Sequence, residues 1–157
     1  MKRFNLILAG GLAAVLATGA AIGGGHGSVE DVVKARQELM KAVGKNFGVL
    51  GDMAKGKLDY DATAAVAAAK ALNEAASTDP ATLWIEGSSN ADFTETRVKP
   101  ELLAEIDKVS EIHAAWSTAT TAMETAAGEG LDALRAAMGP IGEQCGACHK
   151  PYRAPKS

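Results

Sequence analysis

The residues best suited to carry chemistry are two cysteines and a histidine near the C-terminus. The chain has two cysteines in all, and both stand in the run Cys145-Gly146-Ala147-Cys148-His149. Cys-x-x-Cys-His is the sequence to which c-type haem is attached, because two thiols can add across the two vinyl groups of the porphyrin. On a helix, a spacing of three places both sulfurs along one edge of the ring, and His149 lies near the same face. We therefore expect one haem c, covalently bound through Cys145 and Cys148, with His149 as the proximal iron ligand.

Other interpretations of the same residues are weaker. A redox-active cysteine pair usually opens a helix in a fold that contains strands, and no strand pattern is found here. A zinc site needs about four ligands, whereas only two further histidines and no further cysteines are present. His113 lies on an apolar helical stripe, where a second iron ligand is an alternative to an ordinary packed histidine. No enzyme motif is recognisable, and a net charge of −3 does not suggest a nucleic-acid-binding protein.

Four amphipathic segments must position this motif. Apolar residues recur at helical spacing over residues 28–54, 61–76, from Pro100 to Gly128, and 131–152. A connection over residues 78–99 lacks such a pattern, and Pro140 predicts a kink in the last segment. Aromatic residues make up only 4% of the chain, so an alanine-rich core has room for a large flat cofactor. We expect an all-α protein, an antiparallel four-helix bundle around one covalently bound haem.

The N-terminus has the pattern of a secretory signal peptide. Lys2 and Arg3 precede an apolar stretch over residues 6–17, and small residues follow. The stretch is short for a membrane span of roughly 20 residues, so an uncleaved anchor is the lesser alternative. We expect a signal peptide at residues 1–22 and a bundle domain at residues 28–157. The mature protein is then periplasmic, with no stable membrane insertion.

The chain resembles class II cytochromes c, the cytochrome c-prime family, and is closest to its low-spin six-coordinate members. The likeness is clearest in residues 145–153, 134–142 and 36–41, and it extends to residues 46–61. It implies that Arg36 and Gln37 lie near the haem propionates and that Arg153 lies beside the proximal histidine. It also implies that Met40 lies over the distal face of the iron. Redox partner proteins of a respiratory or photosynthetic chain, and a homodimer, are further expectations of the resemblance.

Two functions remain open, and residue 40 separates them. If the Met40 sulfur binds iron, the haem is six-coordinate and suited to electron transfer, which is the function we favour from the sequence. If Met40 only crowds the distal side, a five-coordinate haem binds or scavenges nitric oxide and other diatomic gases. A methionine at helical spacing is often an ordinary flexible core residue, so the resemblance is what singles Met40 out.

Overall fold

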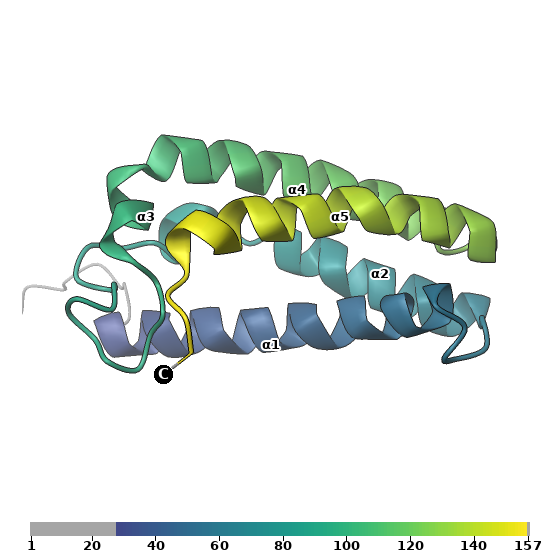
Figure 1. Cartoon of the computed structure of the whole chain (residues 1–157), viewed down its shortest axis with the longest axis horizontal. Coiled ribbons are helices and arrows are strands. Elements are labelled where there is room, and N and C mark those ends of the chain that lie inside the picture. Colours follow the sequence, from purple (N-terminus) through teal and green to yellow (C-terminus); the bar gives the residue numbers. More distant parts are fainter. Residues whose placement is uncertain (1–27, 157) are drawn as a thin grey trace, which may run out of the picture.

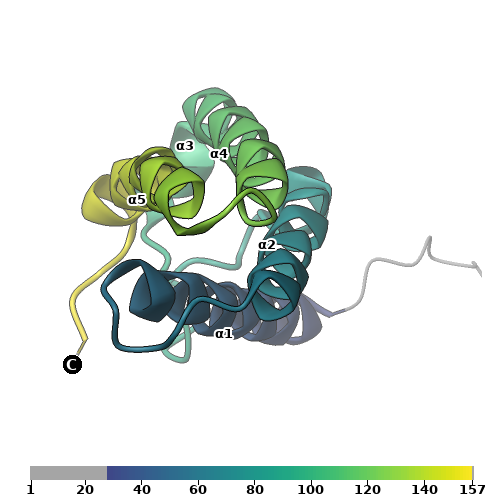
Figure 2. The same ribbon diagram turned by 90° about the vertical axis from the view of Figure 1, so that its right-hand side faces the viewer.

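Four long helices run up and down the molecule in an antiparallel bundle (Figure 1). The computed structural model describes residues 28–156. The long helices are α1 (Val29–Ala54), α2 (Ala62–Ala76), α4 (Ile106–Ala126) and α5 (Leu131–Tyr152), and short helical segments lie at Pro80–Thr82 and in α3 (Pro100–Ala104). Helix α1 packs against α2 and α5, and α4 packs against the same two helices (Figure 2). The expected all-α four-helix bundle is confirmed.

The helix starts follow the capping signals in the sequence. The Ser28 hydroxyl accepts a hydrogen bond from the Asp31 backbone N–H at 3.2 Å, and the Asp31 carboxylate accepts one from the Ser28 N–H at 3.0 Å. This reciprocal pair satisfies two N–H groups that a helix start otherwise leaves without partners. Asp61 caps α2 in the same way, by accepting a hydrogen bond from the Ala64 N–H at 2.7 Å.

One expected helix differs in the structure. The third segment is divided, because Glu105 has φ −114° and ψ 38° and so leaves helical geometry between α3 and α4. Helix α5 continues through Gly139 and Pro140 as one helix, and the kink that the sequence predicts at Pro140 stays a prediction. Within residues 28–156 the only extended pairing is an isolated antiparallel bridge between Val98 and Arg153.

The main hydrophobic core combines large residues from all four long helices with several alanines of α2. Leu50, Leu72, Met123, Leu134 and Ile141 have no exposed surface. Helix α2 contributes mainly alanines, of which Ala65 and Ala69 are also completely buried. Small side chains such as alanine let neighbouring helices approach closely.

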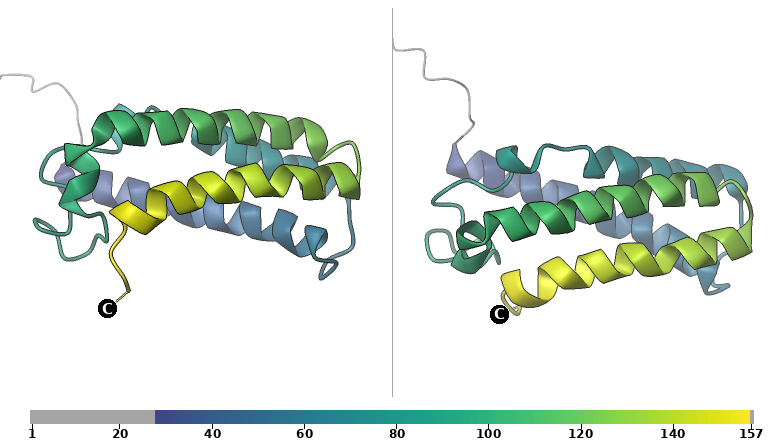
Figure 3. Two further views of the ribbon diagram at one scale, coloured as in Figure 1. Left: turned by 45° about the horizontal axis from the view of Figure 1, so that its top comes forward. Right: turned by 90° about the horizontal axis from the view of Figure 1, so that it is seen from above.

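A second, smaller cluster forms where α3, α4 and the end of α5 meet. Leu102, Val109 and Tyr152 are its buried members, and Trp84 packs against them from the 78–99 connection. This connection and the C-terminal tail lie at the same end of the bundle (Figure 3). The cysteine motif is in the last turns of α5, so it lies at this end too.

The expected signal peptide at residues 1–22 lies outside the described residues. Among residues 28–156, no helix is long and apolar enough to cross a membrane.

Candidate functional site

The cysteine motif occupies the last two turns of α5. Cys145, Cys148 and His149 are all half-buried. Burial raises the pKa of both thiols above the ordinary value, so both stay protonated at neutral pH. A redox-active cysteine pair needs a lowered thiol pKa, so this environment argues against that alternative. Among residues 28–156, no three His, Cys, Asp or Glu side chains lie close enough to hold a metal ion together, which leaves the zinc alternative without support there.

The His149 imidazole is kept neutral. Burial lowers its pKa, and the positive charges of Arg153 and Arg97 lower it further. A histidine must be neutral to bind a metal through its ring nitrogen. His149 is therefore in the protonation state that an iron ligand requires.

A cavity of about 410 Å³ lies beside the motif and opens between α1, α5 and the 78–99 connection. A second cavity of about 90 Å³ adjoins it inside the bundle, and both are lined by Met40, Trp84, Cys148 and His149. The larger volume alone is within the range of about 300–1,000 Å³ that is usual for sites of small molecules and cofactors. The structure therefore places the two half-buried cysteines and His149 on the wall of a space suited to a cofactor.

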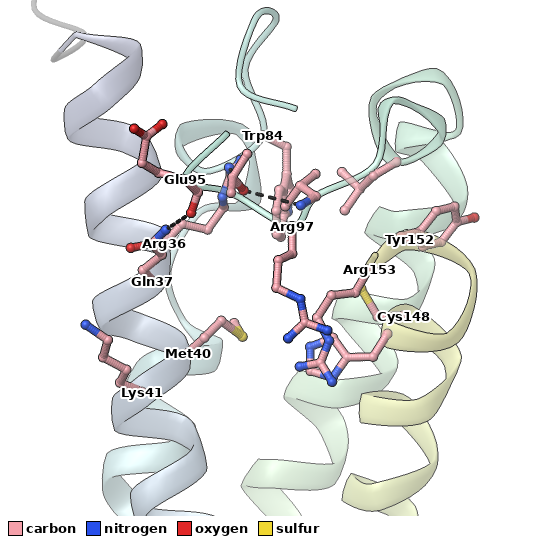
Figure 4. A pocket seen from close by; sticks show the side chains of 14 residues that line it. Arg36, Gln37, Met40, Lys41, Trp84, Glu95, Arg97, Cys148, Tyr152 and Arg153 are labelled. Carbon is pink, nitrogen blue, oxygen red and sulfur yellow. Dashed lines mark hydrogen bonds between the residues drawn. The ribbon is translucent and has the colours of Figure 1, made fainter. Parts of the chain in front are cut away.

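Met40 and His149 enter this space from different helices. Met40 extends from α1 into the cavity, whereas Cys148 and Arg153 belong to the end of α5 on the other side (Figure 4). The chain thus presents a thioether on one wall and an imidazole on another. This arrangement has the form that the resemblance implies for the two faces of a haem.

Arg36 is a buried cation that holds the 78–99 connection. Only 3% of its surface is exposed. Its guanidinium donates four hydrogen bonds, to Leu83 O at 3.1 Å, to Ser88 Oγ and O at 2.9 and 2.8 Å, and to Thr96 Oγ1 at 3.0 Å. It also lies 5.1 Å from the centre of the Trp84 ring. Burial lowers the pKa of Arg36 to about 10, which leaves it charged at neutral pH.

Two polar atoms of α4 support the presence of a group in the cavity. His113 Nε2 and Trp116 Nε1 are buried and have no hydrogen-bond partner among the described residues. Both side chains line the smaller cavity, and their rings meet edge to face with centroids 5.7 Å apart. An unsatisfied buried polar group costs about 1–3 kcal/mol. The buried Arg36, which has no carboxylate partner within residues 28–156, points to the same conclusion: the residues present fit an anionic, partly polar cofactor such as haem.

Haem bound here would supply redox-active iron. Cys145 and Cys148 would hold it, and His149 would bind the iron from the proximal side. Of the other predicted residues, Gln37 lines the cavity and donates to Glu95 O at 2.7 Å, and Arg153 lines it from the C-terminal end of α5. Their roles toward the propionates and the proximal histidine stay predictions.

The structure adds Trp84 and Arg97 to the cavity lining, and it places His113, which the sequence leaves open as a second iron ligand, on the smaller cavity. Trp84 and Arg97 line the larger cavity, and Trp84 and His113 line the smaller one. Burial lowers the pKa of His113, so this histidine is neutral. Arg97 lies in the connection without helical periodicity, where no sequence pattern fixes which side chains turn inward.

Comparison with known proteins identifies the family. The model of the family described as Cytochrome C' matches residues 31–153. The chain is similar to the cytochrome c' of Cereibacter sphaeroides, with 38% identity over 124 residues that make up 79% of this chain and 83% of that protein.

Solved structures agree with this. A cytochrome c' from Rhodobacter sphaeroides superimposes with a TM-score of 0.79 and 36% identity, over 83% of this chain and all of that one. A nitric oxide complex of a variant of cytochrome c prime from Alcaligenes xylosoxidans gives a TM-score of 0.71 and 29% identity. The superposition covers 82% of this chain and 97% of that one. The chain therefore belongs to the cytochrome c' family of class II cytochromes, whose members bind one covalent haem c.

Proposed function

We propose that this protein binds nitric oxide and similar diatomic gases at its haem iron, with His149 as the proximal ligand and Met40 covering the distal side. The observation that carries this proposal is the small cavity of about 90 Å³ next to Met40. Most of its lining is apolar, and it includes Leu39, Val43 and Val109. Uncharged diatomic molecules suit such a space, because they give up little hydration on entering it.

The comparisons favour this function over the electron-transfer function that we prefer from the sequence. The relatives reported above are cytochromes c', and one of the similar solved structures is a nitric oxide complex. In this proposal the Met40 thioether restricts access to the iron without binding it.

The rate of carbon monoxide binding to the ferrous protein tests the proposal. We compare wild type with Met40→Ala and Met40→Leu, and use Met138→Leu in α5, which lines neither cavity, as the matched control. Met40→Ala should bind carbon monoxide at least about tenfold faster, equivalent to about 1.4 kcal/mol of barrier. Met40→Leu should stay close to wild type, because leucine preserves the bulk and only removes the sulfur.

A contrary result would support the second candidate, electron transfer with Met40 as sixth ligand. This candidate rests on the position of the Met40 side chain, which extends into the cavity from the helix opposite the motif (Figure 4). His/Met ligation leaves no open iron site and raises the reduction potential. If the Met40 sulfur binds the iron, Met40→Leu should convert a low-spin haem to a high-spin one. The change in spectrum should then be as large as that caused by Met40→Ala.

We also propose that the mature protein is periplasmic, because residues 1–22 have the pattern of a signal peptide. We further propose, from the family resemblance, that the protein meets redox partner proteins in that compartment and forms a homodimer. Mass spectrometry of a periplasmic fraction should find a chain that begins between about Ala21 and Gly27, within the span expected for signal cleavage. Recovery of the intact chain, including Met1, would contradict it.

A further inference from the structure

The segment around Arg97 is fastened to the tail that follows His149. The Ala154 N–H donates to Arg97 O at 2.8 Å, and Arg97 Nε donates to Ala154 O at 2.8 Å. The Lys99 N–H donates to Tyr152 O at 2.9 Å, and Lys99 Nζ donates to Pro151 O at 2.8 Å. We call these contacts between residues 97–99 and 151–154 the tail clamp. The clamp fixes the backbone on which Arg97 is carried relative to the end of α5.

Arg97 and Lys99 differ in where they lie relative to the cavity. Arg97 lines the larger cavity and extends down into it, whereas Lys99 does not line it (Figure 4). Of the Arg97 side chain, only Nε has a hydrogen-bond partner among residues 28–156, which leaves its two terminal nitrogens available to bind another group. Arg97 also acts electrostatically on the His149 imidazole, which places the guanidinium near the proximal ligand.

The charges that line this cavity are predominantly positive. Helix α1 contributes Arg36 and Lys41, and the 78–99 connection contributes Glu95 and Arg97. The neutral His149 comes from α5, and Arg153 follows the end of that helix. Neither Arg97 nor Arg153 forms an ion pair within residues 28–156. Four of the five N–H groups of Arg36 already donate to the connection. The Lys41 Nζ lies 3.9 Å from Glu38 Oε1, so this cation has a carboxylate partner on its own helix. Arg97 is therefore the cation that the connection presents to the cavity, and its terminal nitrogens are not committed to another described residue.

We propose that Arg97 binds a carboxylate of the haem through its terminal guanidinium nitrogens, in addition to its part in the tail clamp. A haem carries two propionate groups, and a guanidinium fork matches a carboxylate in a bidentate arrangement. Arg97 thereby joins three parts of the protein: the connection, the C-terminal tail and the cofactor. The inference rests on covalent haem attachment and holds whether or not Met40 binds the iron.

The pH dependence of the haem reduction potential tests the proposal on the haem-loaded protein. Protonation of a propionate removes negative charge near the iron, so the potential rises as pH falls through the pKa of that carboxyl. A cation within about 4–6 Å lowers this pKa. Arg97→Met should therefore move the inflection of the curve upward by about one pH unit, and it should lower the potential at neutral pH because a nearby positive charge is lost. Arg97→Lys keeps the charge and should restore most of the wild-type curve.

Lys99→Met is the matched control, because it removes a cation from the same clamp without touching the cavity lining. It should leave the inflection at its wild-type position. Equal haem content and similar thermal midpoints across the variants show that each remains loaded and folded. If Arg97→Met leaves the inflection unchanged, or if Lys99→Met moves it equally, Arg97 serves only the clamp and the proposal is wrong. Neither outcome depends on the spin state of the iron, so failure here is distinct from failure of the gas-binding proposal.

Discussion

The Tyr152 hydroxyl donates a hydrogen bond of 2.8 Å to the Glu105 carboxylate, and so ties the end of α5 to the break between α3 and α4. Tyr152 is buried among Leu102 and Val109, and it lies three residues after His149. The contact therefore helps to fix the helix end that carries the haem ligand. The break between α3 and α4 has a matching consequence, because Glu105 at the break is the residue whose carboxylate accepts this hydrogen bond.

The Tyr152–Glu105 contact makes stability depend on pH in two ranges. The hydrogen bond lowers the pKa of Glu105 below 4.5 and raises the pKa of Tyr152 to about 12. The lowered carboxyl pKa stabilises the fold above pH 4.5, and this contribution is lost as pH falls through the folded-state pKa of Glu105. The raised tyrosine pKa stabilises the fold below pH 10, and this contribution is lost as pH rises through about 12.

Tyr152→Phe should lower the unfolding midpoint at neutral pH. The difference from wild type should shrink below pH 4.5 and again above pH 10. Urea titrations monitored by circular dichroism, at pH values from acidic to alkaline, measure the difference in unfolding midpoint between the two proteins. A difference that stays constant from neutral pH to pH 3 would mean that the Glu105 charge takes no part.

Arg36 should be important for stability as well as for the cofactor. Arg36→Leu removes four hydrogen bonds to the 78–99 connection and leaves buried acceptors without donors. We expect a loss of about 3–5 kcal/mol in the free energy of unfolding. Lys45→Leu, an exposed substitution on the same helix, should change stability by less than about 0.5 kcal/mol. Chemical denaturation of the haem-loaded proteins makes the comparison, and equal effects of the two substitutions would contradict the assigned role.

The alanines of α2 should tolerate no enlargement where they are buried. Ala69 has no exposed surface, whereas Ala67 on the same helix is exposed. Ala69→Leu forces a larger side chain between closely packed helices and should cost about 1–3 kcal/mol. Ala67→Leu should be nearly neutral, since both residues favour helix. Thermal unfolding of the two variants tests this, and a neutral Ala69→Leu would show that the core has room at this position.

The sequence predicts the bundle well because helix periodicity and capping are local signals. Ser28 and Asp61 mark helix starts through their own side chains, and the apolar stripe of α5 includes Leu134, Ile141 and Tyr152, all of which are buried. The break at Glu105 was not predictable, because neither glycine nor proline is present there and its role depends on the distant Tyr152.

Some residues of the candidate site can be predicted from the sequence, and others are found only from the fold. Cys145, Cys148 and His149 are contiguous, so their spacing alone specifies the chemistry. Arg97 and Trp84 come from a connection without periodicity, and only the fold shows that they reach the cavity. Arg36 illustrates a third case: the resemblance places it near the propionates, but only the structure shows that four of its N–H groups bind the connection.

Covalent attachment should depend on both cysteines. Intact mass under denaturing conditions should show one haem on the wild type. Cys145→Ser and Cys148→Ser should each reduce covalent loading strongly, and the double variant should abolish it, because serine cannot form the thioether. Ser110→Ala, which alters a cysteine-sized residue exposed on α4 and outside both cavities, should leave the added mass unchanged. A wild-type protein without the added mass would remove the basis of the whole site.

The absorption spectrum of the purified ferrous protein, before and after addition of carbon monoxide, tests the central claim most directly. A haem held by His149 with an open distal side predicts a high-spin, five-coordinate spectrum with a single broad visible band, which carbon monoxide converts completely to a low-spin form. A wild-type spectrum that is already low-spin, with sharp split bands that carbon monoxide does not change, would contradict gas binding and show that the distal position is occupied by a protein ligand.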